Sequence, residues 1–179
     1  AAVAPGAPGS MGDARWRAGY ALLERHGLHF ELQTPWWHLA EAVDLARDFP
    51  RTQIVLNHAG LPADRSAEGL AGWGAAMRAL AACPNVAVKI SGLGLPGRPW
   101  RVEDNAPIVR AAIETFGVAR CMFASNYPVD RLVASYDTIM SGFRVIVADR
   151  PAAERRALFH DNAARIYRID SPRRATSSS

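Results

Sequence analysis

Polar side chains that could do chemistry follow four apolar stretches of this sequence, each where the stretch ends. They are Gln33, Asn57–His58, Lys89 with Ser91, and Ser125–Asn126. His58 is the strongest single candidate, because an imidazole titrates near neutrality and can bind a metal, transfer a proton or stabilise an oxyanion. A histidine can also simply end a strand, so its interpretation depends on whether the other polar groups lie nearby.

The apolar stretches have the pattern of short buried strands that alternate with helices. We predict strands at 28–33, 52–58, 86–92 and 121–126, and helices at 38–49, 66–83, 103–117 and 131–149, with two short helices after residue 150. Nearly continuous apolar runs are typical of parallel strands covered on both faces. The fold class is therefore α/β, a parallel sheet or part of a barrel, and the carboxyl ends of its strands share one side. The four polar clusters are expected to form one site there.

The loop after the third strand contains GLGLPG, which matches the glycine pattern of dinucleotide sites. Such a site also needs a helix that opens at the loop and an acidic residue at the end of the next strand. Pro96 and Pro99 prevent a helix here, and the next strand ends in Ser125–Asn126. We therefore expect a flexible loop over the strand ends. Arg98 and Trp100 on this loop either contact an anionic or cyclic substrate or are simply an exposed arginine and a packed tryptophan.

Composition excludes several classes of protein. The chain has 179 residues, 49% of them hydrophobic, and a net charge of +4, which fits one globular domain. The arginines are scattered and the chain has a single lysine, so no basic stripe predicts nucleic-acid binding. No apolar run reaches the roughly 20 residues that span a bilayer, so no membrane is expected. Cys83 and Cys121 lie in apolar surroundings, which favours core thiols in a reducing, cytoplasmic protein.

Five stretches together resemble the C-terminal portion of the amidohydrolase-related, metal-dependent-hydrolase-like barrels, in the lactonase branch. They are WRAGYALLERHGLHFELQ, PRTQIVLNHAGLP, PNVAVKISGLG, RCMFASNYPVD and LFHDNAARIYRI, which span most of residues 15–169. The resemblance implies the C-terminal half of a (β/α)₈ TIM barrel, with about four parallel strands, that hydrolyses a lactone or similar cyclic ester. His58 would then polarise the substrate carbonyl or help to bind a divalent ion, zinc or manganese, where one is present.

The sequence departs from the family pattern at two points. Asn126 stands where many relatives carry an aspartate that activates water, and a neutral amide cannot accept a proton as a carboxylate does. Asp130 could replace that carboxylate, unless Pro128 directs it to the rim of the site. The family's H-x-H pair on strand one and an early basic residue are also missing.

These observations lead to the following assignment. We expect catalytic roles for His58, Asn126 and Asp130, substrate contacts from Gln33, Lys89, Ser91 and Arg98, and metal binding, if any, by His58. The alternatives are a decarboxylase on the same scaffold, or a non-catalytic fragment that acts as a binding or assembly module.

Residues 1–14 are predicted to be a flexible segment, 15–169 a partial barrel domain, and 170–179 a disordered tail. Half a barrel leaves two open sheet edges, which invite pairing with another chain. On its own, the polypeptide is therefore expected to be a homo-oligomer, poorly stable or inactive. A cooperatively melting monomer in sedimentation and thermal unfolding would contradict this expectation.

Overall fold

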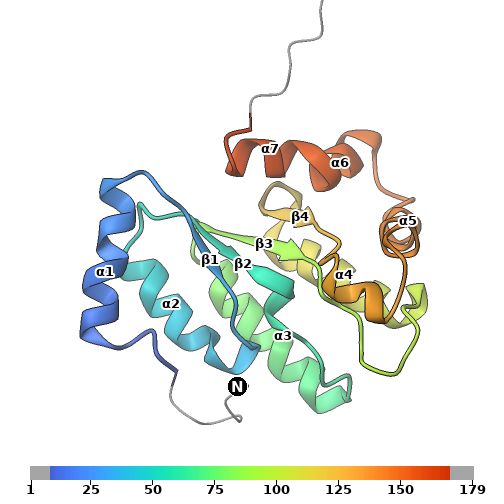
Figure 1. The fold of residues 1–179 in the computed structure, drawn as a ribbon, viewed down its shortest axis with the longest axis horizontal. Coiled ribbons are helices and arrows are strands. Elements are labelled where there is room, and N and C mark those ends of the chain that lie inside the picture. Colours follow the sequence, from blue (N-terminus) through green and yellow to red (C-terminus); the bar gives the residue numbers. More distant parts are fainter. Residues whose placement is uncertain (1–8, 170–179) are drawn as a thin grey trace, which may run out of the picture.

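The centre of the molecule is a parallel sheet of four strands. The structure is a computed structural model that describes residues 9–169 (Figure 1). The sheet has the order β1-β2-β3-β4, and each strand pairs in parallel with the next. The strands are β1 (Phe30–Leu32), β2 (Ile54–Leu56), β3 (Val86–Ile90) and β4 (Cys121–Phe123). This arrangement confirms the predicted α/β class with four parallel strands alternating with helices.

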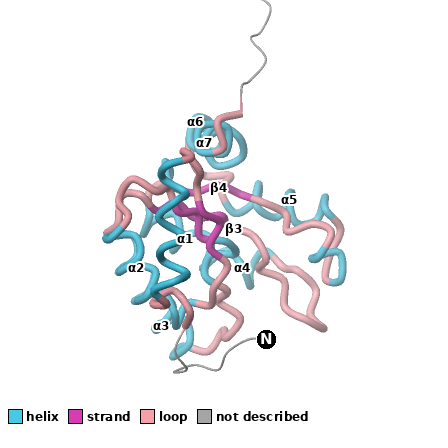
Figure 2. Tube along the Cα trace, turned by 60° about the vertical axis from the view of Figure 1, so that its left-hand side comes forward, coloured by secondary structure: helices cyan, strands magenta, loops and turns pink. Residues whose placement is uncertain are grey.

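Helices cover both faces of this sheet. Figures 1 and 2 show α2 and α3 on one side of the sheet and α6 and α7 on the other. The helices are α1 (Ala14–Arg25), α2 (Leu39–Asp48), α3 (Ala67–Ala81), α4 (Val102–Phe116), α5 (Tyr136–Ile146), α6 (Ala152–Arg156) and α7 (Asn162–Ile166), with a π-helical turn at Ala157–Asp161 between the last two. Among residues 9–169, no helix combines the length and apolar character that a bilayer crossing needs.

Local signals in the sequence set several helix ends. The Ser66 hydroxyl accepts a hydrogen bond from the backbone N–H of Gly69 at 3.0 Å, which makes Ser66 the N-cap of α3. Gly117 ends α4 with a φ of +76°, a conformation that glycine adopts without a Cβ clash. The hydroxyl of Ser135 caps α5 in the same way as that of Ser66.

The two faces of the sheet carry different cores, because successive strand residues point to opposite sides. Leu56 and Val88 are fully buried in the large core between the sheet and the surrounding helices. On the opposite face, Val55, Ala87 and Met122 form a small cluster with Ile166. Cys83 and Cys121 are both buried free thiols, as expected for core residues.

Each predicted strand ends earlier in the structure than the apolar pattern indicated, by one to three residues. The last strand residues are Leu32, Leu56, Ile90 and Phe123, so the polar residues lie in the turns beyond them. The predicted helix at 131–149 starts only at Tyr136, because a 3₁₀ turn at Val129–Leu132 comes first. Helix α1 lies in a region where no helix was predicted.

The predicted boundary at residue 14 also needs a correction. Residues 9–13 are not a free segment, because the backbone amides of Gly9 and Met11 donate to the Glu41 carboxylate and Met11 is buried. The rest of the predicted flexible segment, residues 1–8, and the predicted tail at 170–179 lie outside the described residues.

Candidate active site

His58 lies in a tight turn that directly follows β2. The turn covers Asn57–Gly60, and His58 has a φ of +55°, in the left-handed region that few non-glycine residues adopt. Ala59 and Leu61, the residue directly after the turn, also have positive φ values, so three residues in and beside this turn carry backbone strain. Strain of this kind persists only where the surrounding structure imposes it. The early end of β2 thus places the imidazole in the turn instead of in the strand.

The imidazole of His58 is held by the end of β3. Its Nδ1 lies 2.9 Å from the hydroxyl oxygen of Ser91, a residue that is almost completely buried. Gly92 makes this contact possible, because a Cβ at that position would lie only 2.6 Å from Nδ1 of His58. Gly92 also has a φ of +60°. The residues after β2 and β3 therefore fix Nδ1 of the ring, and Nε2 is left to interact with a substrate.

Asn126 and Asp130 form a second pair after β4. The side-chain amide of Asn126 donates to Oδ1 of Asp130 at 2.8 Å, and the backbone N–H of Asp130 donates to the carbonyl of Asn126 at 3.0 Å. Asn126 has a φ of +55°, so the chain turns back at this residue. Asp130 is only 8% exposed, and its Oδ2 is buried without a hydrogen-bond partner among the described residues. The structure therefore does not place Asp130 on the rim.

Electrostatic interactions connect the two pairs. Burial lowers the pKa of His58, and the positive charge of Lys89 acts in the same direction, whereas the carboxylates of Asp130 and Glu31 raise it. The net effect is a lowered pKa, so the imidazole is neutral at pH 7. A neutral imidazole can donate one hydrogen bond and accept another, which suits acid–base chemistry.

Lys89 lies on the face of the sheet that is opposite to the large core. Its Nζ is 2.8 Å from Oε2 of Glu31 and 5.4 Å from the ring centre of Tyr167, whose hydroxyl donates to the same carboxylate. Burial opposes the ionisation of Glu31, but the hydrogen bonds from Lys89 and Tyr167 outweigh it and lower its pKa. Sequence reasoning missed Glu31 and Tyr167. The signal for Glu31 was a single acid within the apolar strand FEL.

The remaining predicted binding residues lie further out. Gln33 follows β1 at the same edge of the sheet and is exposed. Arg98 is exposed on the loop between β3 and α4, which forms no helix before Val102. Trp100, on the same loop, is buried against Phe143, with ring centres 5.5 Å apart, so it serves the core. The structure thus brings His58, Ser91, Asn126 and Asp130 together and leaves Gln33 and Arg98 at the periphery.

The potential metal ligands at this site are too few for a divalent ion. Protein zinc sites use at least three protein ligands. Within residues 9–169, no three His, Cys, Asp or Glu side chains lie close enough together to hold a metal ion. His58 and the free oxygen of Asp130 provide two donors at most. The described residues do not fit a metal by themselves.

Comparisons with known proteins agree with this geometry. The chain matches the amidohydrolase family over residues 3–169. It is 50% identical over 154 residues to an uncharacterised protein of Sinorhizobium fredii, covering 86% of this chain and 52% of that protein. It is 43% identical over 131 residues to an L-fucono-1,5-lactonase of Burkholderia multivorans, covering 66% of this chain and 44% of that enzyme. The chain thus spans about half the length of these curated relatives.

A solved structure gives the same result. A crystal structure of an amidohydrolase from Burkholderia multivorans, described as having bound zinc, is 33% identical to this chain. The TM-score is 0.81, and the match covers 89% of this chain and 59% of the other. The strand order, the strand-end site and the match over residues 3–169 lead to one conclusion: the chain belongs to the amidohydrolase family.

Proposed function

We propose that this chain contributes the carboxyl-edge half of an active site that hydrolyses a lactone or a similar cyclic ester. The observation that carries the proposal is geometric: His58, after β2, is held by Ser91 at the end of β3, and the neighbouring strand β4 leads into the buried carboxylate of Asp130. The charge of that carboxylate acts to raise the pKa of His58. Lactonase relatives at 43% and 37% identity support the substrate class. Because the chain covers about half of each, further residues complete the site.

His58 acts as the electrophilic partner in the proposed reaction. In this proposal the hydroxyl of Ser91, 2.9 Å from Nδ1, is the donor of the hydrogen bond between them, so the imidazole proton is on Nε2, and the lowered pKa keeps the ring neutral. Nε2–H then donates a hydrogen bond to the carbonyl oxygen of the lactone. This bond strengthens as negative charge develops on that oxygen during the attack of water.

Asp130 acts as the general base. Its Oδ2 accepts a proton from the attacking water, while Asn126 holds Oδ1 and fixes the orientation of the carboxylate. Collapse of the tetrahedral intermediate breaks the bond from the carbonyl carbon to the ring oxygen. The ring oxygen leaves as an alcohol after Asp130 returns to it the proton taken from water. Asn126 thus orients the base instead of replacing it.

The remaining predicted contacts have two kinds of role in this proposal. Ser91 and Lys89 act through their partners, His58 and Glu31. Gln33 and Arg98, which are exposed at the carboxyl edge, hold hydroxyl or carboxylate groups of the substrate. A metal ion, zinc or manganese, would need ligands in addition to His58, so no step is assigned to it.

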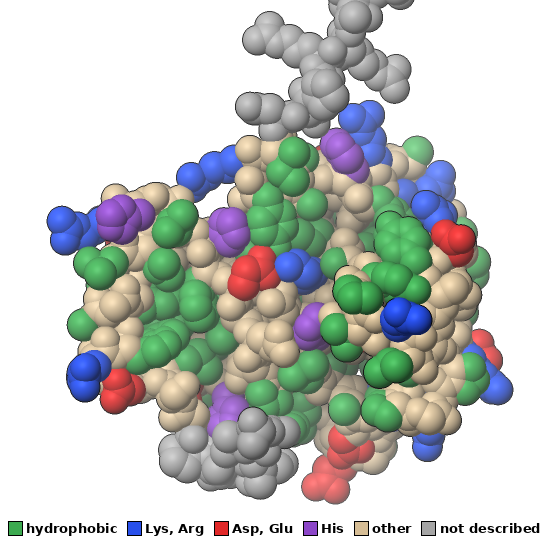
Figure 3. Space-filling model, viewed as in Figure 1, with side chains coloured by type: hydrophobic (Ala, Val, Ile, Leu, Met, Phe, Trp, Pro, Cys, Tyr) green, Lys and Arg blue, Asp and Glu red, His purple; other side chains and the backbone are tan. Residues whose placement is uncertain are grey.

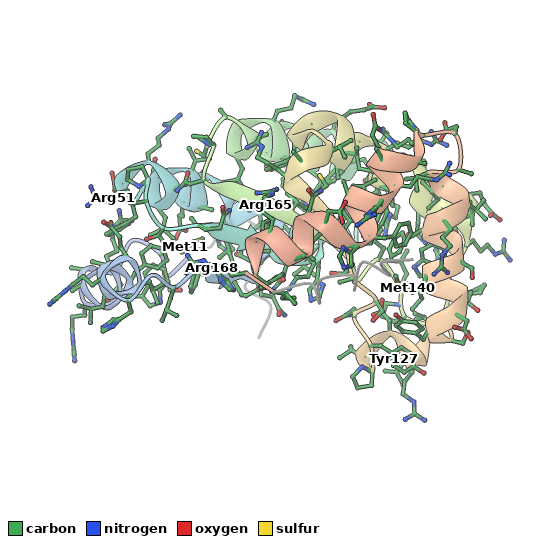
Figure 4. The ribbon with its side chains drawn as sticks, turned by 90° about the horizontal axis from the view of Figure 1, so that it is seen from above. Met11, Arg51, Tyr127, Met140, Arg165 and Arg168 are labelled. Atoms are coloured by element: carbon green, nitrogen blue, oxygen red, sulfur yellow. The ribbon has the colours of Figure 1, made fainter. Side chains whose placement is uncertain are left out.

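The open edges of the sheet support association with another chain. β1 and β4 are the outer strands of the sheet formed by the described residues. Beside β4, Tyr127, Val129 and Leu132 are 45%, 63% and 86% exposed. Figure 4 shows Tyr127 and Met140 on the same side of the molecule, and in Figure 3 hydrophobic side chains gather over this region, at the right of the view. A homo-oligomer formed through these edges remains our proposal for the isolated chain.

The proposed function is tested by replacing His58 in the full-length protein. With L-fucono-1,5-lactone as the first substrate, His58→Ala should lower kcat by about 100-fold or more, since a positioned acid or base contributes roughly that factor. His26→Ala is the control, because His26 is exposed at the end of α1. Chromatography should find the ring-opened acid as the product. Unchanged turnover by the His58 variant would reject the proposal.

A further inference from the structure

The four residues that directly follow β3, Ser91–Gly94, contact both the turn of His58 and the turn of Asp130. They include the start of the GLGLPG stretch, to which the proposed function gives no role. Ser91 is 1% and Leu93 2% exposed, so the segment is a buried part of the fold and not a free loop. A buried segment in contact with both turns can fix their relative positions.

On one side, the segment contacts the imidazole of His58. The hydroxyl oxygen of Ser91 is 2.9 Å from Nδ1 of the ring. The same ring lies against Gly92, where a Cβ would come within 2.6 Å of Nδ1. Because the imidazole contacts two consecutive residues of the segment, a displacement of the segment displaces the imidazole as well.

On the other side, the segment contacts Val133, which lies directly after the turn of Asp130. A Cβ at Gly94 would collide with Cγ2 of Val133, so the two chains approach closely here. The backbone N–H of Val133 donates to the carbonyl of Asp130 at 3.0 Å. Val133 is β-branched and has few alternative rotamers, so its side chain cannot easily turn away. The position of Gly94 therefore affects the turn that holds Asp130.

Arg65 holds the segment in place from the loop between His58 and α3. Its Nη2 donates to the carbonyl of Leu93 at 3.1 Å. Longer contacts of 3.5 Å join the guanidinium to the first turn of α4, at the carbonyl of Asp104 and the side-chain oxygen of Asn105. A planar guanidinium presents several donors in a fixed geometry, which suits it to join a loop to a helix in this way.

We infer that Arg65 and Gly94 are positioning residues of the proposed reaction: they fix Ser91–Gly94, and this segment sets the arrangement of His58 relative to Asp130. The inference rests on the proposed function, because it concerns the two groups that act in it. Both residues act through their neighbours and not through the substrate. Sequence reasoning missed Arg65, since a single arginine in a loop gives no pattern.

The first experiment measures kcat and KM with L-fucono-1,5-lactone for variants of the full-length protein. Arg65→Met and Gly94→Ala should each lower kcat by about tenfold or more and change KM by less than about twofold, because misplaced catalytic groups slow the reaction while the substrate contacts remain. Arg65→Lys should recover part of the loss, since its ammonium can still donate to the carbonyl of Leu93. All variants are compared well below their melting temperatures, so that unfolding does not lower kcat.

Arg101 and Gly19 provide matched controls. The Arg101 side chain is 60% exposed, and Gly19 is exposed on α1, where a Cβ would meet none of the described residues within 4 Å. Arg101→Met and Gly19→Ala should therefore leave kcat unchanged. A raised KM with an unchanged kcat in Arg65→Met would show that Arg65 contacts the substrate, which overturns the inference. Unchanged kinetics in both Arg65→Met and Gly94→Ala would overturn it as well.

A nuclear magnetic resonance measurement separates this inference from the proposed function. In the full-length protein with labelled histidines, the ring Cε1–H signal of His58 is identified by its loss in His58→Gln. This signal should shift in Arg65→Met, whereas that of the exposed His26 should not. A shifted His58 signal in a protein that hydrolyses no lactone would support the link from Arg65 to His58 and reject the proposed function. Hydrolysis that requires His58, with an unshifted signal in Arg65→Met, would reject the link alone.

Discussion

The two faces of the sheet differ in what they contain. The face that packs on α2, α3 and α4 is lined by aliphatic residues that are almost completely buried, such as Leu56 and Val88. The opposite face carries only a small apolar cluster around Met122, and beside it lies the ion pair of Glu31 and Lys89. One face is therefore a complete hydrophobic core, whereas the other mixes apolar contacts with charge.

The two faces therefore contribute to different properties, one to the stability of the fold and the other to the proposed active site. Large apolar burial supplies most of the free energy of folding, so the face that packs on α2, α3 and α4 determines whether the sheet forms. The charges of Glu31 and Lys89 act on the pKa of His58, so the opposite face influences the proposed active site. Substitutions on the two faces should therefore affect different measurements.

The largest difference is expected from a matched pair of valines. Val88 lies in the large core and Val55 in the small cluster, and both are fully buried. Val88→Ala should lower the free energy of unfolding by about 2–3 kcal/mol, because it leaves a cavity among tightly packed neighbours. Val55→Ala should lower it by only about 1 kcal/mol, since α7 can move to fill the gap. Urea denaturation measures both, and equal losses would show that the two faces are equally well packed.

A matched pair of glycines tests whether the contact between His58 and Ser91 at the strand ends matters for catalysis. Gly92 and Gly97 both have positive φ, but only a Cβ at Gly92 would collide with His58, whereas Gly97 faces open space. Both alanine variants should lose about 1 kcal/mol of stability from backbone strain. Only Gly92→Ala should also lower kcat, by about tenfold or more, because the imidazole is displaced from Ser91. A similar kcat for the two variants would remove the proposed role of this contact.

A smaller effect, and one that depends on pH, is expected at Glu31. The pKa of Glu31 in the folded protein is below its unfolded value of about 4.3, so the contact with Lys89 and Tyr167 stabilises the fold fully above that pH. The contribution disappears as the pH falls through the lowered pKa. Glu31→Gln should therefore destabilise the protein by about 1 kcal/mol at pH 7, since the pair is partly exposed, and by less below about pH 4.

Thermal unfolding over a pH series tests this expectation. Glu103→Gln is the control, because the Glu103 side chain is 70% exposed and lies 3.9 Å from its arginine partner. A destabilisation by Glu31→Gln that is constant from pH 7 to pH 3 would show that the loss comes from packing instead of charge.

The sequence was sufficient to predict the sheet and the edge at which the candidate residues lie. The apolar runs predicted all four strands, and their polar ends identified His58, Ser91 and Asn126. The buried position of Asp130 was not predictable, because it depends on a left-handed turn at Asn126 that gives no periodic signal in the sequence. Tyr167 was missed for a related reason, since its partner Glu31 lies 136 residues away in the sequence. Contacts over such distances become visible only after the chain has folded.

The most direct test of the central claim is the turnover of Asp130→Asn beside that of Asn126→Ala in the full-length protein. Our account predicts a loss of about 100-fold or more in kcat for Asp130→Asn, because the amide cannot accept the proton of water. Asn126→Ala should lose much less, because it only releases the orientation of the carboxylate. Full activity of Asp130→Asn, with Asn126→Ala inactive, would contradict the account.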